Sequence, residues 1–243
     1  MSGFTATGAT IVQDIEALPK SIILWRSLTH WLGGMGIIVL AVAILPLLGI
    51  GGVQLFSAEA TAVGGDKLHP RISYTAKRLW YIYVGFTVLE ALMLAFAGMS
   101  VFDAINHSMS TMASGGFSTK NESLAYWNNS PMIQYTVTLF MFLAGTNFVL
   151  IYFGLKGKLE RIWQDNEFRW YVGFITLFTL ITFIGIYTNV KLGSTSVEHP
   201  QIFGAFESSF RHALFQVVAI ITTTGFVTAC LLYTSPSPRD GRI

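Results

Sequence analysis

Long apolar segments constrain the fold of this 243-residue chain more than any other feature. Four of them lie at approximately 23–49, 79–99, 132–155 and 168–188. Each is long enough to cross a bilayer of about 30 Å, which takes roughly 20 helical residues. Only 12% of the residues are charged, whereas soluble domains usually carry about 25%. The pattern predicts an all-α integral membrane protein.

Two further apolar segments, 101–113 and 206–221, are too short and too polar to span the bilayer. Their polar residues include Asp103, His107, Glu207, Arg211 and His212. Lipid offers no hydrogen-bond partners, so half-length helices and irregular loops are tolerated only where protein or a water-filled cavity covers their backbone. We therefore expect the polar loops that follow these two segments to line a cavity.

Three short loops rich in Gly, Ser and Thr recur along the chain, and we call them the filter loops. They are Thr5-Ala6-Thr7-Gly8, Ala113-Ser114-Gly115-Gly116 and Thr222-Thr223-Thr224-Gly225. Their last glycines follow one another at almost identical intervals, in step with the apolar segments. A nearly constant period is typical of internal repeats. The repeat predicted here is a spanning helix, a half-length helix, a filter loop and a second spanning helix.

The physical chemistry of this repeat favours ion permeation. A half-length helix that ends inside the membrane directs the negative end of its dipole toward the centre, which favours a cation there. Glycine permits backbone conformations in which carbonyl oxygens point to a common axis, and threonine hydroxyls add oxygen ligands. Uncharged oxygens suit a monovalent cation better than Mg²⁺ or Ca²⁺. All twelve filter-loop residues are therefore candidate ligands for K⁺ or Na⁺, and no other cofactor is expected.

The filter loops, with Gly98-Met99-Ser100-Val101-Phe102-Asp103-Ala104 before the second and Phe215-Gln216-Val217-Val218 before the third, resemble the Trk/Ktr/HKT potassium-transporter superfamily. The bacterial TrkH/TrkG branch is the most similar, over about residues 1–229. The resemblance implies potassium uptake by a pore-forming subunit with four helix–pore loop–helix units around a pseudo-symmetric, K⁺-channel-like pore. It also implies a homodimer in the bacterial cytoplasmic (inner) membrane and a cytoplasmic TrkA-like nucleotide-binding regulatory subunit.

Measured against that pattern, the chain holds part of the first repeat, a complete second and part of the third. We assign 1–52 to the end of repeat 1, 53–78 to a cytoplasmic loop, 79–155 to repeat 2, 156–167 to a cytoplasmic loop, 168–230 to part of repeat 3 and 231–243 to a non-native tail. The tail is proline-rich and polar where a spanning helix is expected, and Cys230 stands where the family usually has Asp. A fourth filter loop is missing from the sequence.

Basic residues near the ends of the spans indicate the orientation. Lys67, Arg71, Lys77 and Arg78 follow the first span, and Lys156, Lys158, Arg161 and Arg169 follow the third. The positive-inside rule places both loops in the cytoplasm, so the filter loops open outward. The net charge of +2 is too small to indicate nucleic-acid binding.

Several polar residues admit two interpretations. Glu90 lies at membrane depth, so a proton- or sodium-coupled secondary cation carrier that uses Glu90 is the alternative function. His107 and His212 fit polar packing behind the filter loops better than metal ligation, and His30 fits an interfacial anchor. The run 31–36 is either a gate or a site of close helix packing. Ser108 and His107 do not face each other on a helix, so a hydrolase, and an enzyme in general, is not expected.

Overall fold

The computed structural model describes residues 2–10, 12, 14–36, 72–192 and 204–228. Within these ranges every regular element is helical, as the sequence predicts. The elements are α1 (Lys20–Trp31), the π-helical turn η1 (Leu32–Gly36), α4 (Ile72–Phe96), α5 (Val101–Met112), the 3₁₀ turn η2 (Ser123–Trp127), α6 (Pro131–Ala144), α7 (Phe148–Leu155), α8 (Leu159–Gln164), α9 (Asn166–Leu192) and α10 (Ala205–Ile221).

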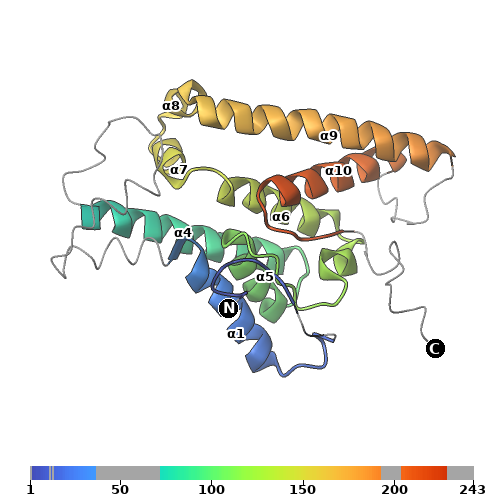
Figure 1. Cartoon of the computed structure of the whole chain (residues 1–243), viewed down its shortest axis with the longest axis horizontal. Helices are drawn as coiled ribbons and strands as arrows, with labels where there is room; N and C mark the ends of the chain where they lie inside the picture. Colours follow the sequence, from blue (N-terminus) through green and yellow to red (C-terminus); the bar gives the residue numbers. More distant parts are fainter. Residues whose placement is uncertain (1, 11, 13, 37–71, 193–203, 229–243) are drawn as a thin grey trace.

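The two half-length helices lie inside the bundle and the long helices cover them. α5 packs against α1, α4 and α6, whereas α10 packs between α6 and α9, with α9 running antiparallel along it (Figure 1). The outer helix α9 leaves large apolar side chains exposed, among them Leu177, Ile181 and Ile184. A face of this kind suits lipid rather than water.

Two helices within the described ranges are long and apolar enough to cross a membrane. They cover Arg78–Phe96 and Asn166–Thr188, close to the spans predicted at 79–99 and 168–188. The short segments predicted at 101–113 and 206–221 are also found, as α5 and α10. Most of the span predicted at 23–49 lies outside the described residues. Two predicted loops are partly helical, because α4 already begins at Ile72 and α8 lies within 156–167.

The prediction of one uninterrupted span over 132–155 is wrong. The segment is split into α6 and α7 by a turn at 145–147. Thr146 donates its backbone N–H to the carbonyl of Leu143 rather than to that of Phe142, so the regular helical bonding stops there. Gly145 lies against the side chain of Thr222 in the third filter loop, and a Cβ at Gly145 would come 2.6 Å from the Thr222 Cγ2 atom.

The turn between α4 and α5 sets the start of the half-length helix α5. Gly98 has φ of 97°, a conformation that favours glycine. Its N–H donates to Ala95 and that of Met99 to Leu94, which is the hydrogen-bond pattern of a glycine-terminated helix. The Ser100 hydroxyl then accepts from the Asp103 N–H at 3.1 Å and donates to the Asp103 carboxylate at 2.7 Å. This capping exchange starts α5 at a defined residue.

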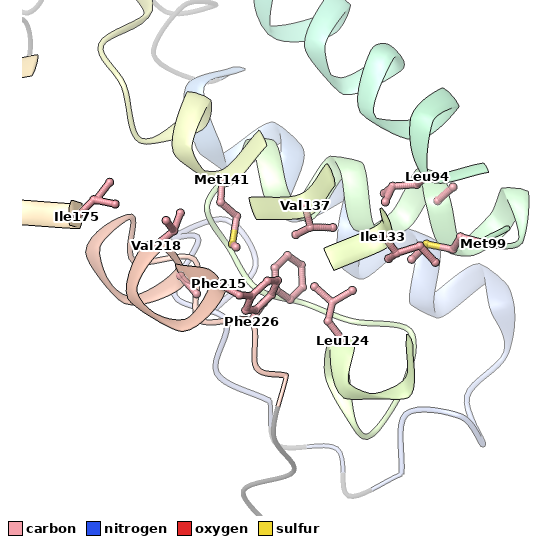
Figure 2. Close-up of a cluster of buried hydrophobic side chains, with 12 residues drawn as sticks. Leu94, Met99, Leu124, Ile133, Val137, Met141, Ile175, Phe215, Val218 and Phe226 are labelled. Atoms are coloured by element: carbon pink, nitrogen blue, oxygen red, sulfur yellow. The ribbon is translucent and has the colours of Figure 1, made fainter. Parts of the chain in front are cut away.

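A buried apolar cluster joins the second and third repeats. Phe215 of α10 and Phe226, which follows the third filter loop, lie side by side at its centre (Figure 2). Val137 and Met141 of α6 close the cluster on one side and Leu124 of η2 on the other. The third filter loop is therefore held from behind by an apolar core.

The ends of the helices allow a test of the predicted orientation. α8 lies at the upper left in Figure 1, beside the left end of α9, whereas α6 begins on the right-hand side. Lys158, before α8, and Asn129, before α6, are both exposed. In the full-length protein with Cys230→Ser, we expect cysteines at Asn129 and Lys158 to react with an impermeant maleimide from opposite sides of the membrane. Labelling of both from outside intact cells would overturn the orientation.

Candidate functional site

The three filter loops follow the same backbone path. The residue two before each last glycine has positive φ, namely 49° at Ala6, 51° at Ser114 and 57° at Thr223. The last glycines have φ of 72° at Gly8, 75° at Gly116 and 75° at Gly225. Left-handed geometry at a residue other than glycine costs roughly 1–2 kcal/mol. Its recurrence at equivalent positions shows that the surrounding structure imposes one loop conformation three times.

Backbone hydrogen bonds close each filter loop in a related way. Ala6, Ser114 and Thr223 each donate to the carbonyl three residues earlier, at 3.0, 2.9 and 3.0 Å. The N–H groups of Thr7 and Gly115 each reach five residues back, at 3.1 and 2.9 Å, while in the third loop Gly225 bonds to Ala219 at 3.1 Å. These bonds terminate α5 and α10 at the loops. The negative ends of both helix dipoles therefore lie at the filter loops.

Neighbouring filter loops touch backbone to backbone. A Cβ on Gly8 would overlap the carbonyl oxygen of Gly115, and a Cβ on Gly116 would overlap that of Thr224. Each contact therefore joins the last glycine of one loop to the third residue of the next. Gly225 has no such neighbour among the described residues. The loops thus form a consecutive arc, in which a glycine is required wherever two loops meet.

Threonine hydroxyls brace the first and third loops internally. The hydroxyl oxygens of Thr5 and Thr7 lie 2.8 Å apart, and those of Thr222 and Thr224 also lie 2.8 Å apart. The Thr222 hydroxyl further donates to the carbonyl of Val218 in α10 at 2.8 Å. The second loop has Ala113 and Gly115 at the equivalent positions, so it cannot form this bond.

The half-length helices hold the segments that follow their loops through polar side chains. Thr119 donates to the carboxylate of Asp103 at 2.7 Å, and its equivalent in the next repeat, Thr228, is hydrogen-bonded to Nδ1 of His212 at 3.0 Å. His107 is fully buried, and its two ring nitrogens bond to the Asp103 carbonyl at 2.8 Å and to Ser118 at 3.0 Å. The interpretation of His107 and His212 as polar packing is confirmed.

A buried charged network behind the third loop was not found from the sequence. Arg211 of α10 is 1% exposed, and its Nε lies 2.9 Å from the Glu207 carboxylate. Arg211 also donates to the side-chain oxygen of Gln134 in α6. Gln134 in turn donates to Asn128 at 2.6 Å, and Asn128 donates to the carbonyl of Thr228 at 3.0 Å. The spacing of four between Glu207 and Arg211 was the available sequence signal.

Both helices that follow a filter loop are interrupted beside the next loop. Gly34 has ψ of −132°, outside the helical range, and a Cβ there would come 2.9 Å from Ala113. Gly145 likewise lies against the first residue of the third filter loop, since a Cβ there would come 2.6 Å from the Thr222 Cγ2 atom. A tyrosine hydroxyl binds a carbonyl at each interruption, since Tyr83 donates to Trp31 and Tyr171 donates to Phe142, both at 3.0 Å.

The structure therefore favours close packing for the run 31–36, which lies against the second filter loop. The sequence did not single out Tyr83 or Tyr171, because tyrosine near a membrane surface usually indicates an interfacial anchor.

The prediction of His30 as an interfacial anchor is wrong. Its ring is completely buried and lies behind the second filter loop. Arg26, on the same helix, is also drawn inward. Its guanidinium lies 4.2 Å from the ring centre of Phe117 and donates to the Thr10 hydroxyl at 3.0 Å. The sequence indicated an interfacial anchor because His30 is beside Trp31, and tryptophan is common at membrane interfaces.

Glu90 of α4 is completely buried and lies beside Thr111 of α5. Neither of its carboxyl oxygens has a hydrogen-bond partner among the described residues. Within the same residues, no three His, Cys, Asp or Glu side chains gather closely enough to hold a metal ion. The filter loops contain only Thr, Ala, Ser and Gly, so their own oxygens are backbone carbonyls and hydroxyls.

The segments after the first and second filter loops are joined outside the bundle. The Asn121 side chain donates to the Asp14 carboxylate at 2.9 Å and accepts from the N–H of Ile15 at 2.8 Å. Lys120 forms an ion pair with Glu16 at 3.3 Å. The hydrogen bond from Asn121 lowers the pKa of the Asp14 carboxyl below its ordinary value. The contact therefore stabilises the folded protein at pH values above the ordinary pKa of the Asp14 carboxyl. This stabilisation is lost as the pH falls through the lowered pKa.

Comparisons with known proteins identify the family to which this helical chain belongs. The chain belongs to the TrkH family of cation transport proteins, which it matches over residues 1–237. The family is one of cation transport proteins, which supports the prediction that the chain is not part of an enzyme.

Three relatives illustrate the similarity. The chain is 44% identical over 230 residues to the Trk system potassium uptake protein TrkH of Salmonella typhimurium and 36% identical over 230 residues to TrkG of Escherichia coli. These matches cover 93% and 94% of this chain and 45% of each relative. The crystal structure of the potassium transporter TrkH from Vibrio parahaemolyticus matches with a TM-score of 0.71 and 40% identity, covering 93% of this chain and 43% of that one. The chain thus spans a little under half the length of these relatives.

The tyrosines at the interruptions provide a test of the packing. We expect Tyr83→Phe and Tyr171→Phe each to lower the free energy of unfolding by about 1 kcal/mol, because each removes a hydroxyl that donates to a backbone carbonyl at the interruption. The measurement is denaturant unfolding of the full-length protein in micelles. Tyr81→Phe is the matched control, since Tyr81 is on the same helix as Tyr83 and 69% exposed. Equal effects at Tyr81 and Tyr83 would contradict the assignment.

Proposed function

We propose that the chain supplies three loops of a carbonyl-lined potassium pathway, as part of the pore-forming subunit of a Trk-type uptake system. The observation that carries the proposal is the arc of loops. Gly8 lies against the Gly115 carbonyl, and Gly116 lies against the Thr224 carbonyl. Three loops with the same backbone geometry thereby bring their carbonyls close together, which is the arrangement that can replace the water shell of a cation.

The chemistry of the arc favours a monovalent cation. The candidate ligands are Thr5, Ala6, Thr7, Gly8, Ala113, Ser114, Gly115, Gly116, Thr222, Thr223, Thr224 and Gly225. None of them carries a charge, whereas sites for divalent cations usually include carboxylates. The C-terminal ends of α5 and α10 add partial negative charge at the loops. The relatives are named as potassium uptake proteins, which supports K⁺ as the transported ion.

A complete pathway needs a further loop beside Gly225. This glycine shares the left-handed geometry of Gly8 and Gly116 but has no loop against it within the described part of the chain. The relatives are more than twice as long as the matched region. We propose that the rest of the full-length protein provides a fourth loop here and closes a pseudo-symmetric ring. In this proposal, residues 231–243 do not belong to that ring.

The proposed setting is the bacterial inner membrane, with the filter loops open to the outside. The exposed apolar faces of α4 and α9 support contact with lipid. The resemblance to the Trk family supports a homodimer and a cytoplasmic TrkA-like nucleotide-binding partner. The proposed boundaries of the repeats are those given for the sequence, with α4 and α5 in repeat 2 and α9 and α10 in repeat 3.

A coupled carrier is the second candidate, because Glu90 is a buried carboxyl without a described hydrogen-bond partner. Proton coupling through Glu90 requires that Glu90→Gln removes the dependence of rubidium uptake on the proton gradient while uptake itself persists. Uptake by the Glu90→Gln protein that still falls with a protonophore, as in the unmodified protein, would exclude this mechanism.

Serine substitutions at the loop glycines test the proposed function. We expect Gly8→Ser, Gly116→Ser and Gly225→Ser each to lower the preference for K⁺ over Na⁺ in the full-length protein. Each added Cβ strains a residue with positive φ, and at Gly8 and Gly116 it also pushes a carbonyl out of place. The measurement is rubidium uptake with K⁺ or Na⁺ as competitor, at matched amounts of membrane-inserted protein.

Gly85→Ser is the matched control. Gly85 lies in α4 with no neighbour within 4 Å and without positive φ. Gly98 is unsuitable, because its φ of 97° would itself strain a serine. An unchanged ion preference in all three loop variants would mean that the loops are structural turns, and the proposed function would fail.

A further inference from the structure

We infer that His30 positions the second filter loop and takes the place of the threonine–threonine hydrogen bond that braces the first and third loops. This inference rests on the proposed function, and it assigns a residue outside the loops to the setting of ion preference. His30 is on α1, in the helix that follows the first filter loop, so the contact reaches from one repeat into the next.

The His30 ring contacts the second filter loop at Gly115 and also contacts one residue on each side of the loop. Its Nδ1 lies 3.2 Å from the Ser110 hydroxyl at the end of α5. Its plane stacks on Phe117, with ring centres 3.7 Å apart and an angle of 13° between the planes. A Cβ on Gly115 would overlap the imidazole ring. The side chain therefore fills the space directly behind Gly115 and contacts residues on both sides of the filter glycines.

The other two loops have a threonine at the position equivalent to Gly115. The third residue of the loop is Thr7 in the first and Thr224 in the third, and each hydroxyl bonds to the threonine two residues earlier. The second loop has Ala113 and Gly115 instead and cannot make the bond. The contact of Gly115 with His30 explains why this position has no side chain.

The equivalent position behind the third loop has an apolar residue. Gly34 and Gly145 are equivalent at the helix interruptions, and His30 precedes Gly34 by the same spacing as Met141 precedes Gly145, so His30 corresponds to Met141. Met141 belongs to the apolar cluster around Phe226, which follows the third loop as Phe117 follows the second (Figure 2). The internally braced third loop thus has an apolar side chain at this position, whereas the unbraced second loop has a polar aromatic ring.

The position of Gly115 matters for the ion because its carbonyl oxygen lies against Gly8 of the neighbouring loop. A shift of the Gly115 backbone therefore moves a proposed ligand of the cation. Removal of the His30 ring leaves a cavity behind Gly115, into which a glycine-containing backbone can relax. We expect the distances from the ion to its carbonyl ligands to become less uniform as a result.

The test compares three variants of the full-length protein, with the ion preference measured as for the glycine variants. His30→Ala should lower the preference for K⁺ over Na⁺ by about fivefold, the factor that corresponds to one lost hydrogen bond of ordinary net strength. Ala113→Thr combined with Gly115→Thr introduces the missing threonine–threonine hydrogen bond, but the new side chain at position 115 overlaps the His30 ring. This double variant should therefore lower the preference for K⁺ over Na⁺ by more than fivefold. The triple variant, which combines His30→Ala with Ala113→Thr and Gly115→Thr, should recover the preference, because the threonines then occupy the space of the imidazole.

Trp25→Ala is the matched control, since Trp25 is on the same helix and 58% exposed. Its ion preference should not change. If His30→Ala fails to insert into the membrane, the triple variant still decides, because only a replacement brace can restore both insertion and preference. Failure of the triple variant to recover would overturn the inference.

An unchanged preference in His30→Ala would overturn it as well. The proposed function would stand in both cases as long as Gly116→Ser still lowers the preference. It would fall only if Gly8→Ser, Gly116→Ser and Gly225→Ser all leave the preference unchanged.

Discussion

The backbone contact between one filter loop and the next requires a residue without a side chain, and the arrangement of the bundle follows from this requirement. A Cβ on Gly8 or Gly116 would occupy the place of a carbonyl oxygen from the following loop. The left-handed geometry that makes this approach possible recurs at Gly225. It is also found two residues before the last glycine of each loop, at Ala6, Ser114 and Thr223. An uncharged cation site made of carbonyls depends on such an approach, because each oxygen contributes little alone and several must converge. The helices around the loops keep this strained backbone in place.

The repeats keep the same backbone with different side chains. The segments after the second and third filter loops are tied back to their half-length helices by Asp103 and Thr119 in one repeat and by His212 and Thr228 in the next. The interrupted helices, in contrast, use the same chemistry twice, with a tyrosine hydroxyl that donates to a backbone carbonyl beside the interruption. The geometry of the carbonyls is therefore more uniform than the sequence. Differences such as His30 in one repeat and Met141 in the other give each loop a separate chemical environment.

The helical class and the three loops could be predicted because both depend on local sequence. The length of the apolar segments predicts membrane helices, and the Gly/Thr pattern, which returns at nearly equal intervals, indicates the repeat. The burial of His30 and the Arg211 network could not be predicted, since both depend on which helix lies behind which loop. The split of α6 and α7 was missed for a related reason. Gly145-Thr146-Asn147 lies in an apolar stretch, and the break lies against Thr222, which is distant in the sequence. The proposed filter ligands and repeat boundaries are predictions still to be tested.

The most direct test of the central claim is the position of the ion itself. A crystal structure of the full-length protein with Tl⁺ or Rb⁺ would reveal the cation by its anomalous scattering. The account predicts anomalous peaks on the axis between the filter loops, with the carbonyl oxygens of Thr7, Gly115 and Thr224 as ligands. Peaks at the Glu90 carboxylate, and none between the loops, would contradict it.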